Sequence, residues 1–446
     1  MIEELYSKYV GTGYRVTTDS RAISGGEMFF ALRGENFDGN DYALKAIEAG
    51  AAWAVVNGDA GLPENPKLIK VADPFRELQE LAVYHRLHVL GDKRLPVIGL
   101  TGTNGKTTTK ELIREVLATK YRVTATEGNL NNDIGVPLSI LKITPETEIA
   151  VIEMGANHPD DIAKLVKVSQ PDYGLITNVG KAHLLGFGSF EGVKAAKGEL
   201  YKWLGNHRGS VIFINEDDAD LREMAASQPC HTFGYGIGHQ GVELLPTDAE
   251  HPFVRLQIPA SDGTAREIRT NLVGAYNANN VLAAIAVGEY FGVPFEDAAK
   301  AVEAYLPKNN RSQLMRSGSN TLIVDAYNAN PSSMAVAVAN FAEFRSERKL
   351  ALLGDMRELG EDSVKEHITI VRKLADAGLD SCLVGTEFRK ALDQLATEEC
   401  AVSASVKWFA TSEDLASWLS SQEFSETAFL VKGSRGIRME NVLKVL

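Results

Sequence analysis

Short apolar runs alternate with amphipathic segments through the middle of the chain. The apolar runs span residues 96–100, 148–154, 173–178 and 210–215, and each has the length of a buried strand. Between the first two, Leu112, Ile113, Val116 and Leu117 recur at the spacing of one helix face. Buried strands that alternate with amphipathic helices are typical of a parallel sheet covered by helices, so the middle is predicted to be α/β.

Similar alternation extends to both ends of the chain. Strand-like runs at 28–32, 51–56 and 67–71 precede a helix that opens at Asp73-Pro74, and 91–96 has the composition of a linker. Near the C-terminus, strand-like runs occupy 321–325, 349–354, 381–385, 407–410 and 427–433. With 446 residues and roughly 150 per domain, we expect three α/β domains: an N-terminal domain (1–92), a central parallel-sheet domain of the P-loop ATPase type (93–314) and a Rossmann-like domain (315–446).

Composition narrows the function classes. The formal net charge of −13 argues against nucleic acid as a partner. The three cysteines, Cys230, Cys382 and Cys400, form neither a disulfide framework nor a zinc pattern, which favours free thiols in a reducing compartment. The longest apolar run, 281–287, is too short to span a bilayer, and the first residues lack a signal-peptide pattern. We therefore expect a cytoplasmic protein without membrane insertion.

A glycine-rich turn between a buried strand and an amphipathic helix is the sharpest chemical motif. The sequence GLTGTNGKTTTKELI at 99–113 has the context that a phosphate loop requires. Lys106 would charge-pair with the β- and γ-phosphates, Thr107 would ligate Mg²⁺, and backbone N–H groups from 103 to 106 would face the phosphate. The pattern GxxxxGK[ST] needs Gly at position 100, which is Leu100, so a chance glycine-rich turn is the alternative. The predicted nucleotide-binding loop comprises Gly102, Thr103, Asn104, Gly105, Lys106, Thr107 and Thr108.

Three ionisable residues follow strands or lie on a helix face of the same domain. Glu153 ends an apolar strand, where a carboxylate suits Mg²⁺, although a helix N-terminal or surface acid fits equally well. His183 follows the third strand, and imidazole is a poor Mg²⁺ ligand, which favours a structural histidine. Lys197 shares a helix face with apolar residues; it would pair with phosphate or carry a modification, unless it is a surface lysine.

Asparagines and two charged residues complete the candidates. The loop 128–134 is rich in Asn and Gly, which suits either a polar ligand or plain turn chemistry. Asn277 could cap the apolar helix that follows, whereas Asn280 lies inside it and needs a partner. Arg311 could stabilise a developing phosphate charge, and Asp325 ends a strand where it could hydrogen-bond a ribose.

Taken together, these motifs resemble the Mur ligase family over nearly the whole chain. TGTNGKTTT at 101–109 matches the ATP loop of the family, and Glu153, His183, Lys197, Asn280, Arg311 and Asp325 follow its order. Several stretches resemble the branch that adds D-alanyl-D-alanine to a UDP-N-acetylmuramoyl tripeptide: 18–21, 28–39, 153–162, 177–189, 196–201, 325–334, 352–360 and 431–440. Two positions depart from the family pattern, Val324 in place of an acid and Asn310 in place of a glycine.

The resemblance implies roles that the residues alone do not. Lys197 matches a position that CO₂ carbamylates, which would make it a Mg²⁺ ligand together with His183, while Glu153 and Thr107 would surround a first Mg²⁺ ion. Asn280 would hold phosphates, Arg311 the γ-phosphate and Asp325 the ATP ribose. The remaining implied contacts are Tyr327 and Asn328 with the nucleotide, Ser20, Arg21 and Phe30 with the uridine nucleotide, and Asn129, Asn131 and Asn132 with the muramoyl substrate.

The resemblance also implies a reaction. A tripeptide carboxylate would attack the γ-phosphorus of ATP, the amine of D-alanyl-D-alanine would displace phosphate from the acyl-phosphate, and the C-terminal domain would close over a monomeric enzyme. The alternatives are another ligase of the superfamily, of the folylpolyglutamate or cyanophycin type, or a P-loop ATPase that needs no amine. A binding protein with a degenerate loop is disfavoured by the intact Lys106-Thr107 pair.

Overall fold

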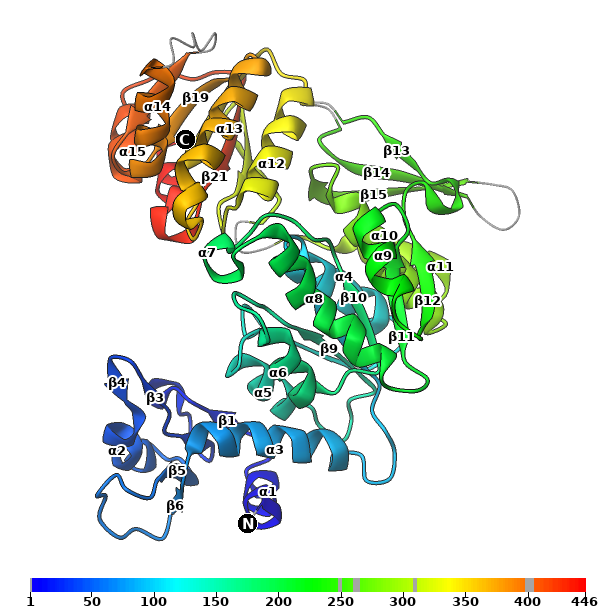
Figure 1. Cartoon of the computed structure of the whole chain (residues 1–446), viewed down its shortest axis with the longest axis vertical. Coiled ribbons are helices and arrows are strands. Elements are labelled where there is room, and N and C mark those ends of the chain that lie inside the picture. The colour runs from blue at the N-terminus through cyan, green and yellow to red at the C-terminus, as the bar shows by residue number, and fades with distance from the viewer. Residues whose placement is uncertain (1, 248–250, 260–264, 308–310, 398–404) are drawn as a thin grey trace.

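Three sheets with flanking helices follow one another along the chain (Figure 1). The computed structural model describes residues 2–247, 251–259, 265–307, 311–397 and 405–446. The N-terminal sheet is parallel in the order β1-β2-β5-β6, with a small antiparallel hairpin, β3–β4, beside it. Their bounds are β1 Val16–Thr17, β2 Met28–Phe30, β3 Arg33–Gly34, β4 Phe37–Asp38, β5 Trp53–Asn57 and β6 Leu68–Val71.

The central sheet has six parallel strands in the order β12-β11-β10-β7-β9-β8. The strands are β7 Val97–Thr101, β8 Val123–Ala125, β9 Ile149–Glu153, β10 Tyr173–Ile176, β11 Val211–Asn215 and β12 His231–Tyr235. Helices α4 (Lys106–Ala118), α10 (Asn277–Tyr290) and α11 (Phe295–Ala304) cover one face, and α5 (Gly135–Leu141), α6 (Asp161–Ser169) and α8 (Phe190–Gly205) cover the other. The predicted face of α4 is confirmed, because Leu112, Ile113, Val116 and Leu117 are all fully buried.

The C-terminal sheet has the order β16-β17-β21-β18-β19-β20, and only β16 is antiparallel. Its strands are β16 Gln313–Ser317, β17 Asn320–Asp325, β18 Arg348–Gly354, β19 Asp380–Val384, β20 Val406–Phe409 and β21 Thr427–Lys432. The helices around it are α12 Pro331–Glu343, α13 Ser363–Asp376, α14 Thr386–Thr397 and α15 Ser412–Leu419. The predicted α/β fold class is confirmed. The domain limits stay a prediction, and the second one, at 314/315, would fall inside β16.

Several strands have no counterpart in the sequence prediction. A three-stranded antiparallel sheet, β13 Glu243–Leu245, β14 Phe253–Pro259 and β15 Ala265–Val273, extends from the central domain, and β8, β12 and β16 were also missed. Along β14, Val254, Leu256 and Ile258 are buried while the residues between them are partly exposed. That period of two marks a half-covered strand, and a search for continuous apolar runs passes over it.

Two helices join the N-terminal domain to the central domain. α1 (Ile2–Gly11) and α3 (Pro74–His88) pack together, and α3 lies against α5 and α6. As the sequence predicts, α3 begins at Asp73-Pro74, where the Asp73 carboxylate accepts the Phe75 N–H at 2.9 Å. His85 is wholly buried and pairs through Nε2 with the Ile143 carbonyl at 2.8 Å. This joint is part of one continuous apolar core that spans both domains.

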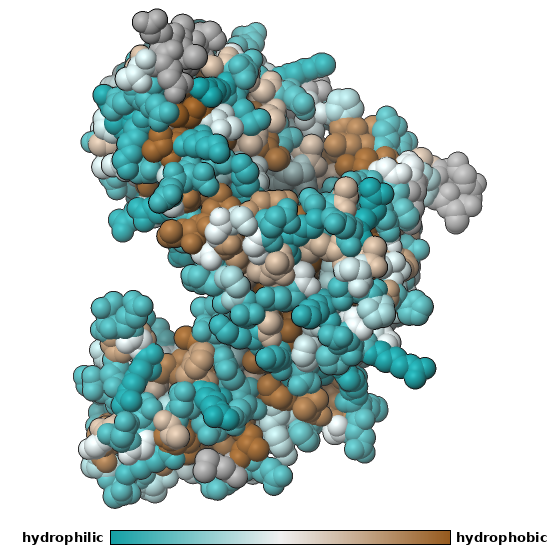
Figure 2. Space-filling view, viewed as in Figure 1, coloured by the Kyte–Doolittle hydropathy of each residue, from teal (hydrophilic) through white to brown (hydrophobic). Residues whose placement is uncertain are grey.

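The face shown in Figure 2 is hollowed between the N-terminal domain and the rest of the molecule. The β3–β4 hairpin lies on one side of the hollow, and α7 (Leu184–Phe187) lies with the C-terminal domain on the other (Figure 1). Among the described residues, no helix is both long and apolar enough to cross a membrane.

Candidate active site

The phosphate loop joins β7 to α4 at the carboxyl edge of the central sheet. Gly102 has φ +149°, and a Cβ there would lie 1.9 Å from Thr177 Oγ1. Gly105 has φ +80°, and a Cβ there would lie 2.7 Å from Asn280 Oδ1. Both positions therefore need glycine, because the loop backbone presses directly on the end of β10 and the start of α10.

Of the backbone amides from 103 to 106 that were predicted to face a phosphate, two bind within the protein instead. The Thr103 N–H donates to the Asn178 carbonyl at 2.9 Å, and the Asn104 N–H donates to Asn178 Oδ1 at 3.0 Å. These two amides are thus engaged within the protein instead of facing a phosphate. The amides of Gly105, Lys106 and Thr107 stand at the N-terminus of α4, where no helical acceptor precedes them, so they are the ones that an anion would meet.

Lys106 folds over its own loop. Its Nζ donates to the carbonyls of Gly102 at 2.7 Å and Thr103 at 3.1 Å. Burial lowers the pKa of Lys106, nearby Glu153 opposes that shift and Arg311 adds to it. The amine is therefore held where the loop would surround a phosphate.

Glu153 ends β9 with only 1% of its surface exposed, which rules out the surface and helix-end alternatives. Its Oε1 accepts from Thr107 Oγ1 at 3.2 Å and from Asn131 Nδ2 at 2.8 Å. Its Oε2 is buried without a hydrogen-bond donor. A buried carboxylate oxygen that accepts no hydrogen bond is costly, and a hard cation such as Mg²⁺ prefers such an oxygen. Thr107 and Glu153 thus fit a divalent cation.

Within the described ranges, no group of three or more His, Cys, Asp and Glu residues could enclose a metal ion by itself. A cation at Thr107 and Glu153 would accordingly complete its shell with water and ligand oxygens, as Mg²⁺ does when it binds with phosphates.

Lys197 and His183 lie close to the loop, but in different settings. Lys197 on α8 is 2% exposed, so it is not a surface lysine, and its Nζ stands 5.8 Å from the Phe187 ring centre. Burial, reinforced by Lys106, holds the pKa of Lys197 well below its usual range. His183, at φ +50°, pairs through Nδ1 with Glu358 of the C-terminal domain. Burial lowers the pKa of His183, and Glu358 opposes this shift.

Two asparagines of α10 form a chain behind the loop. Asn280 Oδ1 accepts from Thr109 Oγ1 at 3.0 Å, and Asn280 Nδ2 donates to Asn277 Oδ1 at 2.8 Å. Asn277 does not cap the helix; its Nδ2 donates to the Val273 carbonyl at 2.8 Å and to Ser312 Oγ at 3.1 Å. Asn280 therefore has the partners that its burial requires, and it buttresses the loop at Gly105.

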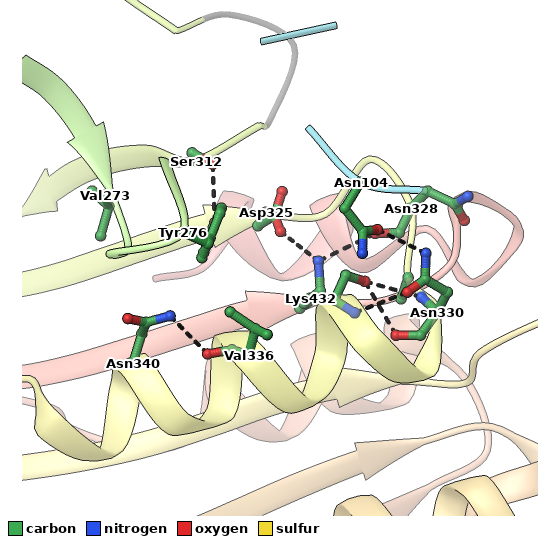
Figure 3. A network of polar contacts seen from close by, with 12 residues as sticks. Asn104, Val273, Tyr276, Ser312, Asp325, Asn328, Asn330, Val336, Asn340 and Lys432 are labelled. Carbon is green, nitrogen blue, oxygen red and sulfur yellow. Dashed lines mark hydrogen bonds and ion pairs between the residues drawn. The ribbon is translucent and has the colours of Figure 1, made fainter. Parts of the chain in front are cut away.

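The C-terminal domain contributes the opposite wall. Figure 3 shows Asp325, at the end of β17, paired with Lys432 at the end of β21. Lys432 is 1% exposed at its side chain, so it holds the Asp325 carboxylate at the sheet edge. The Arg311 guanidinium stacks 3.6 Å from the Tyr327 ring centre, and the Arg435 guanidinium lies 5.4 Å from it. Asn328 is exposed beside them.

Four residues of the C-terminal domain hold it against the central domain, and the sequence prediction missed them. Asn330 Nδ2 donates to Asn104 Oδ1 of the phosphate loop at 2.8 Å (Figure 3). The other three are Ser332, whose Oγ accepts the Lys181 N–H at 2.9 Å, Glu366, which pairs with Lys181 Nζ at 2.8 Å, and Glu358. All occur in or near the family-like stretches 325–334 and 352–360, but no local pattern shows what they contact.

A cavity of about 570 Å³ lies between these two walls. It brings together most of the predicted site residues, and it adds Asn279, whose buried Oδ1 has no hydrogen-bond partner. The predicted residues that line it are Thr103, Asn104, Gly105, Lys106, Thr107, Thr108, Asn129, Asn131, Glu153, His183, Asn280, Arg311, Asp325, Tyr327 and Asn328.

Some predicted residues lie apart from this cavity. Asn132 Oδ1 accepts the Gly135 N–H at 2.8 Å, which is turn chemistry at the start of α5. Arg21, with 88% of its side chain exposed, and Ser20 lie in the N-terminal domain, where Asp19 binds Arg21 at 2.8 Å. Phe30 is fully buried, so its side chain packs in the domain core and presents no surface to a ligand. Val324 is buried in β17, and Asn310 lies outside the described residues.

A second, more open pocket of about 960 Å³ is lined by Glu358, which pairs with His183 of the cavity. It lies at the carboxyl ends of β18, β19 and β20 in the C-terminal sheet. Arg357 and Arg438 supply positive charge in it, and Leu185 and Ile437 supply apolar surface. Its position next to the His183–Glu358 pair places it within reach of the phosphate-loop cavity.

A phosphate loop that opens into a cavity walled by a Rossmann-like domain defines the class of this protein, a multidomain nucleotide-binding α/β enzyme. Three family models match the chain in order: the Mur ligase family catalytic domain at 13–91, the Mur ligase middle domain at 100–288 and the Mur ligase glutamate ligase domain at 310–435. The chain belongs to the Mur ligase family.

Individual relatives agree with this placement. The UDP-N-acetylmuramoyl-tripeptide--D-alanyl-D-alanine ligase of Bacillus subtilis is 34% identical over 435 residues, which cover 97% of this chain and 92% of that protein. A crystal structure of MurF from Acinetobacter baumannii matches with a TM-score of 0.82 and 32% identity, over 96% and 92% of the two chains. The MurF ligase of Thermotoga maritima in complex with ADP matches with a TM-score of 0.81 and 26% identity, over 97% and 96%. The predicted family resemblance is confirmed.

Proposed function

We propose that the protein is an ATP-dependent ligase that adds D-alanyl-D-alanine to UDP-N-acetylmuramoyl tripeptide, in the synthesis of peptidoglycan precursors. The observation that carries the proposal is full-length similarity to ligases of that name, and a phosphate-loop cavity lined by Thr107 and Glu153, which would hold the cation, supports it. A folylpolyglutamate- or cyanophycin-type ligase would share the loop, but the similarity to a D-alanyl-D-alanine ligase covers 97% of this chain and so extends through the N- and C-terminal domains.

ATP would bind with its phosphates on the N-terminus of α4. Lys106 and Arg311 would spread the charge of the γ-phosphate, and Asp325, fixed by Lys432, would accept from the ribose hydroxyls. Mg²⁺ held by Thr107 and Glu153 supplies Lewis-acid stabilisation of phosphate charge when it is bound. The tripeptide carboxylate attacks the γ-phosphorus, and the P–O bond to ADP breaks, which gives an acyl-phosphate.

Lys197 would complete the site as a carbamate. Burial lowers the pKa of the Lys197 amine, which favours its neutral form, and the neutral amine is the form that reacts with CO₂. The carbamate is an anion, which suits a second cation beside His183. Mass spectrometry of the native protein in bicarbonate, compared with a K197A variant, tests this addition.

The open pocket at Glu358 fits the dipeptide. Its ammonium would approach the Glu358 carboxylate next to the cavity, its carboxylate would meet Arg357 and Arg438, and its methyl groups would meet Leu185 and Ile437. The free amine then attacks the acyl carbon and phosphate leaves. We also propose that the enzyme is monomeric and cytoplasmic.

The test is phosphate release from ATP and Mg²⁺ with the UDP-linked tripeptide and D-alanyl-D-alanine added singly and together. We expect release only with both, together with a UDP-linked pentapeptide product. Comparison of tripeptides with lysine or diaminopimelate at the third position then gives the preference. Release that ignores both substrates would replace the proposal with a P-loop ATPase.

A further inference from the structure

A second lysine is buried one helical turn beyond Lys106. Lys110 on α4 is 2% exposed, and it ranks among the largest fully buried side chains of the protein. Ordinary lysines keep their ammonium in water, because taking it out costs several kcal/mol. Its burial directly behind the phosphate loop therefore requires a partner, and none of the roles assigned above uses it.

The contacts of Lys110 centre on Glu153. Its Nζ donates to the Thr126 carbonyl at 2.5 Å and stands 3.9 Å from Glu153 Oε2, the oxygen without a hydrogen-bond donor. Thr126 Oγ1 accepts the Glu153 N–H at 3.0 Å. Lys110 and Thr126 thus hold Glu153 from behind, through its carboxylate and its backbone.

The distance of 3.9 Å between Lys110 Nζ and Glu153 Oε2 determines the kind of contact that the lysine makes. It is too long for a hydrogen bond, so Oε2 keeps its lone pairs, yet it is short enough for strong attraction in a dry interior. The Lys106 Nζ is engaged instead by the Gly102 and Thr103 carbonyls of its own loop. The other oxygen, Oε1, is already fixed by Thr107 and Asn131.

We propose that Lys110 is a positioning residue for Glu153: anchored on the Thr126 carbonyl, its ammonium stabilises the buried carboxylate and holds it in place as a ligand for a divalent cation. The inference rests on the cation site of the proposed function. The contact also connects the cation site with the loop predicted to face the muramoyl substrate, because Thr126 opens the loop that carries Asn129 and Asn131. Glu111, whose Oε1 lies 3.9 Å from Lys110 Nζ, supplies the second negative charge.

The experiment measures Mn²⁺ binding by electron paramagnetic resonance in the presence of ADP, which does not depend on turnover. The variants are K110M, K110R and, as a matched control, R114M, which removes an exposed charge one turn further along the same helix. We expect K110M to weaken Mn²⁺ binding by about tenfold or more, as loss of an outer-shell group does. K110R should restore most of the affinity, and R114M should match the wild type.

A double-mutant cycle shows whether Lys110 acts through Glu153. In the E153Q background, K110M should weaken Mn²⁺ binding no further, and this double variant also avoids an unpaired buried charge should K110M alone fold poorly. Equal or tighter Mn²⁺ binding by folded K110M, or equal losses with and without Glu153, would overturn the role of Lys110. If the wild type binds no Mn²⁺ with ADP, the cation site of the proposed function fails, and the role of Lys110 fails with it.

Discussion

The joint between the N-terminal and central domains is aromatic and buried, whereas the joint between the central and C-terminal domains is polar and encloses a cavity. In the first, Tyr9 and His85 pack in a shared apolar core, with Arg86 Nη2 bound to Asp172 at 2.9 Å. In the second, Asn330 and Glu366 make polar contacts with the central domain, and Val273 of β15 adds an apolar contact with the core of the C-terminal domain. A large apolar joint resists opening and a small polar one permits it, so the C-terminal domain is the one expected to move.

The largest effect is expected where the polar joint encloses the phosphate loop. K106M removes the charge that would meet the β- and γ-phosphates, so we expect turnover to fall by about 10²–10³-fold, as for loss of one preorganised donor. Steady-state phosphate release measures it. The control is K202A, which changes an exposed lysine on α8 and should leave turnover unchanged. Turnover in K106M equal to that of the wild type would show that the phosphate loop takes no part in the reaction.

The buried joint should fail with acid. Burial lowers the pKa of His85 from 6.5 to about 4, so the unfolded chain takes up a proton that the native joint refuses. The contribution of His85 to the free energy of unfolding is complete above pH 6.5 and is lost as the pH falls to 4. This contribution is at most about 3 kcal/mol. Urea unfolding at pH 7, 5.5 and 4.5 should show a smaller loss in H85F than in the wild type. Equal losses would contradict a neutral His85.

The N-terminal domain should affect substrate binding and leave the chemical step unchanged. If Arg21 holds the uridine nucleotide, R21A should raise the KM for the UDP-linked tripeptide by about tenfold, the worth of a charged hydrogen bond, with kcat unchanged. R76A, which changes an exposed arginine at the start of α3, is the control. A fall in kcat with unchanged KM would mean that the distant domain acts on the chemical step.

The smallest effect concerns the stack of the Arg311 guanidinium on the Tyr327 ring. Y327L removes the ring beneath Arg311 and should lower kcat/KM for ATP by about two- to fivefold, which corresponds to one cation–π contact. Y327F keeps the ring and should behave like the wild type. A loss in Y327F equal to that in Y327L would assign the effect to the hydroxyl group instead of the stack.

The sequence predicted what depends on local pattern. The buried strands, the apolar face of α4 and the start of α3 follow from periodicity and capping, and most of the site gathers because carboxyl ends of parallel strands share an edge. Glu153 could be placed at that edge, but the burial of its Oε2 without a hydrogen-bond donor could not be foreseen. Phe30 shows the converse, since a family motif residue proved to be core.

The partners across domains lay beyond such patterns. Glu358 meets His183 from 175 positions away, and Asn330 meets Asn104 from 226 positions away. Nothing in the spacing of either residue encodes the docking of one domain on another. The antiparallel sheet was missed for a different reason, because β14 alternates buried and partly exposed positions and so contains no continuous apolar run.

Because both domains line the cavity, nucleotide binding and docking of the C-terminal domain are thermodynamically coupled. The factor by which docking raises the affinity for the nucleotide equals the factor by which the nucleotide raises the equilibrium constant for docking. A small molecule that wedges between Asn330 and Asn104 would therefore compete with ATP without occupying any phosphate position. Its potency would fall as the ATP concentration rises, so enzyme kinetics alone would report it as an ATP mimic.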